Sequence, residues 1–457
     1  MNTPEQSIPA LPQTNRTFYG AMFAIAVPIM IQGLMNSLVN MADTVMISRL
    51  GTTELAAAGL GNQVFFLLNM FLFGITSGAS VFSAQFWGRG DIAGVRKTTG
   101  MALALVLPLS AVFTVAGVVF PSRVLGLYTQ DAEVITEGAR YLSLMALSFI
   151  PFGISFTFII ILRTIRKVRL AMTATLISLS LNVLLNYLLI FGAGPIPRLG
   201  IAGAGLATVL SRLVELAIVL VITYAKGYAP AGTVREFSAV DRLFIKGFLR
   251  IAMPVFANEV LWSVGITMQS VIFARSGTEN IAAFNITVTV SQLVWVVFIG
   301  LGNSAAVLIG NNIGAGDEAA ARKAAQKTTF FNPLAAAAVG LLLIPLSALI
   351  PVLFNASPGV LGSARIMLMI MALLYPFRSF NMTMVVGVCR AGGDTIFCAF
   401  YDVLFLWALA LPLAAFLVYL SNPPAWLIFV TMASEEPAKA VLGWWRLRSG
   451  RWLRRVV

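Results

Sequence analysis

The sequence predicts an all-α polytopic membrane protein with twelve transmembrane helices in two pseudo-symmetric six-helix lobes. Of its 457 residues, 59% are hydrophobic and only 11% are charged, too few to cover a soluble exterior. Most apolar runs reach ~20 residues, enough to cross a hydrocarbon core ~30 Å thick. A segment near the N-terminus also resembles a segment in the second half of the chain, which indicates an internal duplication.

The expected spans follow from the positions of the apolar runs. They are 20–48, 54–86, 97–120, 136–162, 170–192, 200–225, 247–274, 280–310, 324–353, 361–389, 396–420 and 424–446. The expected domains are a cytoplasmic N-terminal tail at 1–19, an N-lobe at 20–225, a cytoplasmic linker at 226–246, a C-lobe at 247–446 and a basic cytoplasmic tail at 447–457.

The two copies of the duplication are related by one constant offset of 226 positions. The corresponding stretches are 25–60 with 251–286, GITSGASVFSAQFWGRGD at 74–91 with GLGNSAAVLIGNNIGAGD at 300–317, and Arg96 and Lys97 with Arg322 and Lys323. Because each copy holds an even number of spans, both copies enter the membrane from the same side. We therefore expect parallel repeats related by an axis along the membrane normal, an arrangement that suits alternating access around a midplane site.

Basic residues gather in alternate loops and in the C-terminal GRWLRRVV tail. The positive-inside rule then predicts that both termini are cytoplasmic. It also explains the net charge of +13 without a nucleic-acid partner. We expect a monomer in the cell inner (plasma) membrane, with the lipid bilayer as its surroundings and no cleaved signal peptide.

The composition excludes several kinds of chemistry. There is no histidine, and the two cysteines are Cys389 and Cys398. A His/Cys metal site and a Ser/His or Cys/His catalytic pair are therefore not expected, nor is a stabilising disulfide. We expect a protein that is not an enzyme and has no cofactor and no transition-metal site.

The first span carries a polar stripe. Gln32, Asn36, Asn40 and Asp43 follow one another at helical spacing, so they share one face. An ionised carboxylate inside a span is costly and should face a cavity or a partner. Asp43 is suited to binding Na⁺ with neighbouring oxygens or to taking up a proton. The alternative is a hydrogen bond that packs two helices together.

Six stretches in order along the chain resemble the multidrug and toxic compound extrusion (MATE) family. They are DTVMISRLGTTELAAAGL at 43–60, LNVLLNYLLIFG at 181–192, GIAGAGLATVLSR at 200–212, GNNIGAGD at 310–317, RAGGDT at 390–395 and DVLFLWALALPLA at 402–414. The resemblance covers essentially the whole chain. It implies a secondary antiporter that exports small organic compounds, often cationic, in exchange for inward-flowing Na⁺ or H⁺.

The resemblance also implies a cation site in the N-lobe. Asp43 matches the family's aspartate of the first span, and Asn182 and Asn186 match positions where members carry Asn followed by Asp or Asn. Asn40 and Thr208 are further oxygen donors. Because Asn186 stands where some members have a second aspartate, a two-carboxylate proton site is not expected and Na⁺ is favoured over H⁺. The alternative for the two asparagines is interhelical hydrogen bonding.

A second set of candidates for coupling or substrate binding lies in the C-lobe. Glu259 matches a family glutamate, and Arg378 and Asn381 lie on the span where some relatives carry an aspartate. Arg378 is able to pair with Glu259, which would make that residue a structural ion pair, or with Asp402. Gln269 is the repeat counterpart of the N-lobe aspartate, so the lobes share a backbone plan but not a site.

Other charged residues in the spans have structural interpretations. These are an intrahelical Arg212 and Glu215 pair, a similar interfacial cluster of Glu435, Glu436 and Lys439, and helix caps at Asp91 and Asp317.

Three rival functions remain open. A flippase for lipid-linked precursors would be expected to hold several basic residues in its spans, and here these are few. The lack of histidine and of an acid-rich motif argues against a membrane-embedded enzyme. A channel is less suited than a carrier to two lobes with distinct acids.

Overall fold

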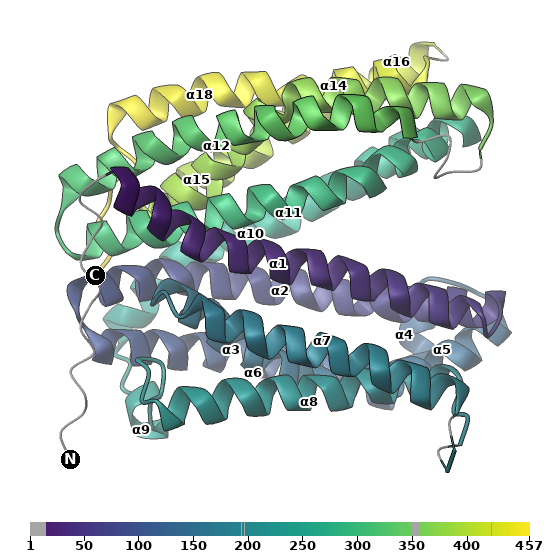
Figure 1. The fold of residues 1–457 in the computed structure, drawn as a ribbon, viewed down its shortest axis with the longest axis horizontal. Coiled ribbons are helices and arrows are strands. Elements are labelled where there is room, and N and C mark those ends of the chain that lie inside the picture. The colour runs from purple at the N-terminus through teal and green to yellow at the C-terminus, as the bar shows by residue number, and fades with distance from the viewer. Residues whose placement is uncertain (1–14, 193, 196, 350–355, 422) are drawn as a thin grey trace. The chain divides into compact units, whose positions relative to one another are not determined.

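The computed structural model describes residues 15–192, 194–195, 197–349, 356–421 and 423–457. These residues are helical nearly throughout and include no strand (Figure 1). Eleven of the helical stretches are long and apolar enough to cross a membrane. The predicted fold class is confirmed. Most of the predicted tail at 1–19 and the end of the ninth predicted span, at 350–353, lie outside the described residues.

The chain divides into two compact units, which we describe separately. The described part of unit 1 comprises 31–87, 91–192, 194–195 and 197–246, and that of unit 2 comprises 15–30, 88–90, 247–349, 356–421 and 423–457. Helix α1 (Asn15–Ser48) therefore contributes its first half to unit 2 and its second half to unit 1. The lobe and linker boundaries stay a prediction.

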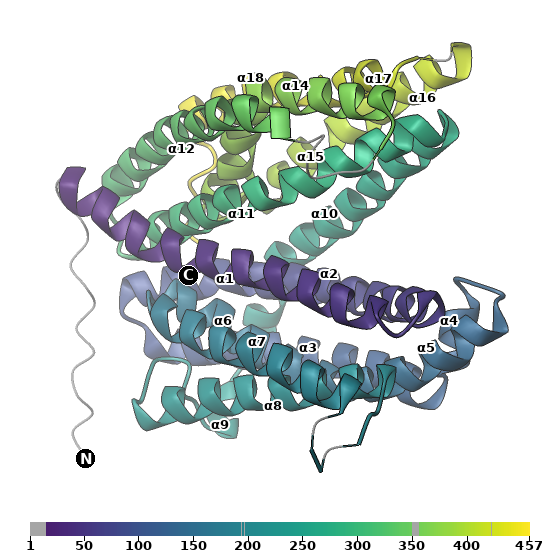
Figure 2. The same cartoon turned by 45° about the vertical axis from the view of Figure 1, so that its right-hand side comes forward.

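In unit 1, helices α3, α6, α7 and α8 run side by side (Figures 1 and 2). The elements of this unit after α1 are α2 (Thr52–Arg89), α3 (Ile92–Val119), α4 (Pro121–Gly126), α5 (Ala132–Met145), the 3₁₀ turn η1 (Ala146–Ser148), α6 (Phe149–Thr164), α7 (Val168–Phe191), α8 (Ile201–Ala225) and α9 (Val234–Phe237).

In unit 2, α14 packs against α11, α12, α17 and α18 (Figure 2). The elements of this unit are α10 (Arg242–Arg275), α11 (Thr278–Gly314), α12 (Glu318–Leu346), η2 (Ser347–Leu349), α14 (Pro358–Met382), the π-helix η3 (Thr383–Arg390), α15 (Thr395–Phe405), the π-helix η4 (Leu406–Ala410), α16 (Leu411–Leu420), α17 (Ala425–Ala433) and α18 (Glu435–Ser449).

The duplication is visible in the helix bounds. Helices α2 and α11 begin at Thr52 and Thr278, and α3 and α12 begin at Ile92 and Glu318. Both pairs are separated by the offset of the sequence repeat.

Equivalent side chains also cap the two helices that follow. Asp91 accepts a hydrogen bond from the Gly94 N–H at 2.8 Å, and Asp317 accepts one from the Ala320 N–H at 2.8 Å. The carboxylates satisfy N–H groups that have no partner within the helix. The predicted caps are confirmed.

Prolines account for three irregular turns. Pro437 has no N–H to donate to Ala433, where α17 ends, so the predicted twelfth span forms two helices. Pro412 and Pro151 likewise follow the π-helix η4 and the 3₁₀ turn η1. Each ring opposes the carbonyl of the residue four positions earlier, and the altered turn relieves the clash.

The short helix α9, in the polar segment after α8, packs against α3. Thr233 and Glu236 form a reciprocal capping box, and the Glu236 carboxylate also pairs with Arg96. The close fit is evident at Gly100, where a Cβ atom would lie 2.2 Å from the Phe237 carbonyl oxygen. The start of α3 is therefore covered by an anionic residue and by the backbone of this segment.

Candidate cation site

Unit 1 contains a polar cavity of about 440 Å³ between α1, α2, α5, α7 and α8. Asn40, Asp43, Asn182 and Thr208 lie on its wall. The polar stripe of α1 places Asn36 on the same wall. The fifth predicted residue, Asn186, is buried and does not line the cavity, but it forms hydrogen bonds with Asp43 and Asn182, which do.

A chain of hydrogen bonds links the central residues. The Asn186 amide donates to Asp43 Oδ1 at 2.6 Å and contacts Asn182 Oδ1 at 3.3 Å. The Asn182 amide points to Ser211 Oγ at 3.4 Å. The carbonyl oxygen of Asn186 is buried and accepts no hydrogen bond from the described residues. An oxygen in this state is an acceptor with unused capacity beside a carboxylate.

The cavity wall also carries a cationic side chain, Arg212, whose charge is already compensated. Arg212 donates to Glu215 Oε2 at 2.8 Å, which confirms the predicted intrahelical pair, and its guanidinium lies over the Phe152 ring. In the described structure, no ion pair neutralises Asp43. The cavity wall therefore carries one carboxylate whose charge is not balanced.

A second chain of hydrogen bonds fixes Glu215. Arg163 donates to Gln32, Gln32 donates to Thr175, and Thr175 donates to Glu215 Oε1 at 2.9 Å. The sequence indicated Gln32, as the first member of the α1 stripe, and Glu215, as the partner of Arg212. Thr175 was not predicted, because a single threonine in an apolar helix carries no signal of its own.

The two asparagines and Thr208 also have structural roles. Asn182 and Asn186 bond across helices, as their alternative interpretation expects, and the Thr208 hydroxyl donates to the Ala204 carbonyl at 3.0 Å. These bonds orient the side-chain oxygens without using up all of their lone pairs. Structural and ligand-binding roles are therefore compatible here.

In unit 2, Glu259 forms a buried ion pair. Its Oε1 lies 2.5 Å from Nη2 of Arg390, and each side chain is at most 10% exposed. Glu259 and Asp402 were the partners of Arg378 expected from the sequence. In the structure, Arg378 instead pairs with Glu436 at 3.0 Å. Arg390, at the end of the π-helix η3, was missed because nothing in the local pattern joins it to α10.

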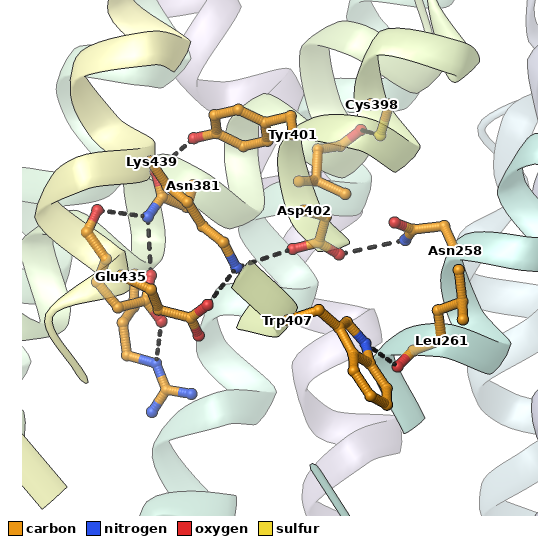
Figure 3. A network of polar contacts seen from close by, with 12 residues as sticks. Asn258, Leu261, Asn381, Cys398, Tyr401, Asp402, Trp407, Glu435 and Lys439 are labelled. Carbon is orange, nitrogen blue, oxygen red and sulfur yellow. Dashed lines mark hydrogen bonds and ion pairs between the residues drawn. The ribbon is translucent and has the colours of Figure 1, made fainter. Parts of the chain in front are cut away.

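Asp402 belongs to a neighbouring network (Figure 3). It accepts from the Asn258 amide at 3.2 Å and from Lys439 at 3.4 Å, and Lys439 also lies 3.2 Å from Glu435. The sequence predicted an interfacial cluster of Glu435, Glu436 and Lys439, but Glu436 pairs instead with Arg378. Lys439 and Glu435 are buried, so the cluster is internal and is not a surface pair.

The remaining C-lobe candidates lie at the edge of this network. Asn381 donates to Glu436 Oε2 at 2.7 Å and accepts from the Tyr401 hydroxyl at 2.5 Å. Gln269 and Arg378 line a small pocket of about 50 Å³. The structure therefore places Asn381 and Arg378 on one glutamate, while Glu259 is held separately by its own arginine.

The described residues hold no group of three or more Cys, Asp or Glu side chains suited to a metal ion. Cys389 and Cys398 are both buried and free, as expected.

Comparison with known proteins places these features in a family. The family model MatE matches residues 28–188 and 254–416. The chain is 25% identical to the probable multidrug resistance protein NorM of Thermotoga maritima, over 95% of this chain and 93% of that protein. It is also 25% identical to the multidrug resistance protein PmpM of Pseudomonas aeruginosa, over 88% of this chain and 86% of that protein.

A solved structure has the same fold. It is the outward-facing conformation of a multidrug resistance MATE family transporter, with a TM-score of 0.86 and 20% identity, covering 99% of this chain and all of that one. Because the family model matches well over half of the residues, in both halves of the duplication, the chain belongs to the MATE family of membrane transporters.

Proposed function

We propose that this protein is a secondary active antiporter that exports organic compounds, often cationic, in exchange for Na⁺ or H⁺, with Na⁺ favoured. The observation that carries the proposal is the unbalanced carboxylate of Asp43 in a polar cavity. The other charged side chain on the described wall of this cavity, Arg212, is already paired with Glu215. Such a cavity attracts a cation. The names of the multidrug relatives support the substrate class.

The oxygen atoms around Asp43 suit Na⁺. Asp43, Asn182 and the buried carbonyl of Asn186 supply carboxylate and amide oxygens, and Thr208 and Asn40 supply two more from the cavity wall. Hard cations prefer such ligands. A proton needs only the carboxylate, so the amide oxygens are better explained by Na⁺.

We assign the C-lobe a secondary role. Arg390 balances Glu259, so this carboxylate contributes less attraction for a cation than Asp43 does. Gln269 and Arg378 line a pocket that is too small for a bulky compound unless the surrounding helices move, and Asn381 bonds to Glu436 on its wall. We propose that these residues respond to substrate binding.

Coupling follows from competition between the two ligands. A cation that enters from outside and binds Asp43 favours the state that releases substrate, and substrate from the cytoplasm favours the cation-free state. Each ligand drives the change only as far as its affinities for the two states differ. The proposed setting is the inner membrane, with both termini cytoplasmic and a monomer as the functional unit.

Exchange in proteoliposomes tests the proposal. Proteoliposomes that contain wild type or Asp43→Asn are loaded with a fluorescent organic cation. They are then given an inward Na⁺ gradient, an inward proton gradient or neither. We expect Na⁺-driven export in wild type and none in Asp43→Asn, with both proteins monodisperse. Unimpaired exchange by the variant removes Asp43 from the mechanism, and export driven only by protons overturns the choice of Na⁺.

A further inference from the structure

Unit 2 carries a groove of about 900 Å³ between α12, α14 and α18, separate from the cation site. Leu334 and Ala337 of α12, Phe377 of α14 and Trp444 of α18 contribute to its walls. Leu334 is 59% exposed and Trp444 is 48% exposed. In a protein that spans the membrane, such an apolar groove is open to lipid chains.

Two arginines lie together at one end of the groove. Arg322 is the fifth residue of α12 and Arg448 is in the last turn of α18. The two ends meet, since a Cβ on Gly450 would lie 2.1 Å from Arg322 Nη1. Both arginines are exposed, and neither forms an ion pair with any carboxylate in the described residues. The groove therefore combines an apolar body with a cationic end.

The repeat supplies an internal comparison. Arg96 is the counterpart of Arg322, and Arg96 is neutralised by Glu236 of α9. The same segment covers Gly100 with the Phe237 backbone, whereas the counterpart of Gly100 is the exposed Gln326. In unit 1, the chain itself thus provides an anion and a cover at this position. In the described part of unit 2, no carboxylate pairs with Arg322, and Gln326 is exposed on the groove wall.

We propose that the groove binds an anionic phospholipid of the surrounding bilayer. Its phosphodiester lies between Arg322 and Arg448, where guanidinium groups form charge-assisted hydrogen bonds to phosphate oxygens. One acyl chain runs along the apolar wall past Leu334 and Ala337. The phosphate would give Arg322 the negative partner that Glu236 of α9 gives its counterpart Arg96 in unit 1. The paired arginines repel the organic cations assigned to export, so this site is not a second substrate site.

Native mass spectrometry of the delipidated full chain in a non-ionic detergent tests the proposal. The protein is titrated with dioleoyl phosphatidylglycerol, with dioleoyl phosphatidylcholine and with glycerol 3-phosphate. We expect phosphatidylglycerol to bind at least about tenfold more tightly than phosphatidylcholine. Arg322→Gln and Arg448→Gln should each weaken phosphatidylglycerol binding about fivefold, from the attraction of one basic residue for an anionic lipid.

Two further variants separate a lipid from other occupants. Ala337→Leu narrows the apolar part without changing any charge and should also weaken phosphatidylglycerol binding. Arg365→Gln removes an exposed arginine about three turns before the groove on α14 and should leave binding unchanged. Unchanged melting temperatures confirm that the exposed-site variants are folded.

Three results would overturn the proposal. Equal affinity for the two lipids would show that the arginines are not used. Displacement of phosphatidylglycerol by glycerol 3-phosphate at similar concentration, with Ala337→Leu unaffected, would indicate a site for soluble phosphates. An equal loss in Arg365→Gln would show non-specific attraction of anions to a basic protein.

Discussion

Single residues decide how the carboxylates of Asp43 and Glu259, both in membrane-spanning helices, are stabilised. Asp43 receives a hydrogen bond from the neutral amide of Asn186, whereas Glu259 lies against the Arg390 guanidinium. Removing one partner of a buried ion pair leaves the other charge less well solvated. The same substitution at the two sites should therefore affect different properties.

Glu259→Gln should destabilise the protein by about 3 kcal/mol, because Arg390 loses its closest carboxylate. The double variant Glu259→Gln with Arg390→Gln should regain more than half of that loss. Unfolding midpoints in detergent measure both effects. Glu137→Gln, which breaks a pair with the exposed Arg140, is the matched control and should cost less than about 1 kcal/mol. A loss in the double variant equal to that of Glu259→Gln alone would contradict the pairing.

Asn186→Asp should change the coupling ion. A second carboxylate 2.6 Å from Asp43 Oδ1 cannot ionise together with the first, so the pair retains a proton. We expect export by this variant to respond to a proton gradient more than to a Na⁺ gradient. Asn182→Asp is a useful comparison, because the Asn182 amide donates to Ser211 and not to Asp43. Unchanged dependence on Na⁺ in Asn186→Asp would argue against a direct role of this residue.

Sequence alone identified Asp43 but not Arg390, for a physical reason. A polar stripe on one helix follows from local periodicity, and the cost of a charge inside a span marks its acid. The choice of partner depends on how distant helices pack. Arg378 therefore had two plausible partners from sequence, and the structure gives it Glu436.

At the scale of elements, most spans could be predicted because each is a long apolar run between charged loops. The exceptions have local causes. The segment after Pro424 divides at Ser434 because charged residues and Pro437 interrupt it, and the π-helix η3 has no comparable signal in the sequence. The positions of the spans could thus be predicted from the apolar runs, whereas irregular turns depend on tertiary packing.

Helix α9 should loosen in acid. The Thr233 backbone N–H donates to Glu236 at 2.7 Å and, with help from Arg96, lowers the pKa of this carboxyl below its ordinary value. Its stabilising effect is therefore complete above the ordinary pKa, about 4.3, and is lost as the pH falls through the lower folded value. Hydrogen exchange of 233–237, corrected for intrinsic rates, should show less protection in that range.

Glu236→Gln should show the same loss at neutral pH and little further change in acid. The side chain is 39% exposed, so the effect is reduced by solvent screening and should stay within about fivefold in exchange rate. Arg235→Gln, at an exposed neighbour, is the control. Equal protection in Glu236→Gln and wild type at pH 7 would contradict a role for the carboxylate in holding α9.

At the scale of the whole molecule, duplication produced two units with matching helix starts and different polar interiors. The N-terminal unit has an open cavity around one unbalanced acid, and the C-terminal unit has a dense set of ion pairs. The repeat and the overall fold could be predicted from sequence because backbone plan depends on many residues. The asymmetry depends on a few side chains whose partners lie on other helices.

If Na⁺ binds at Asp43, it should stabilise the entire folded chain, because a ligand that binds only the native state shifts unfolding by RT ln(1 + [L]/Kd). At a Na⁺ concentration 100 times the dissociation constant, this is about 2.7 kcal/mol. We therefore expect a higher apparent melting temperature for wild type in NaCl than in KCl at equal ionic strength. Asp43→Asn should show the same temperature in both salts, since its cavity lacks the carboxylate. Glu259→Gln, although less stable overall, should keep the difference between the two salts.

Because no transport is involved, this measurement separates cation binding from coupling. A wild-type protein whose melting temperature does not depend on Na⁺ but rises in acid would point to protons as the coupling ion. A Na⁺ effect that survives in Asp43→Asn would place the ion elsewhere.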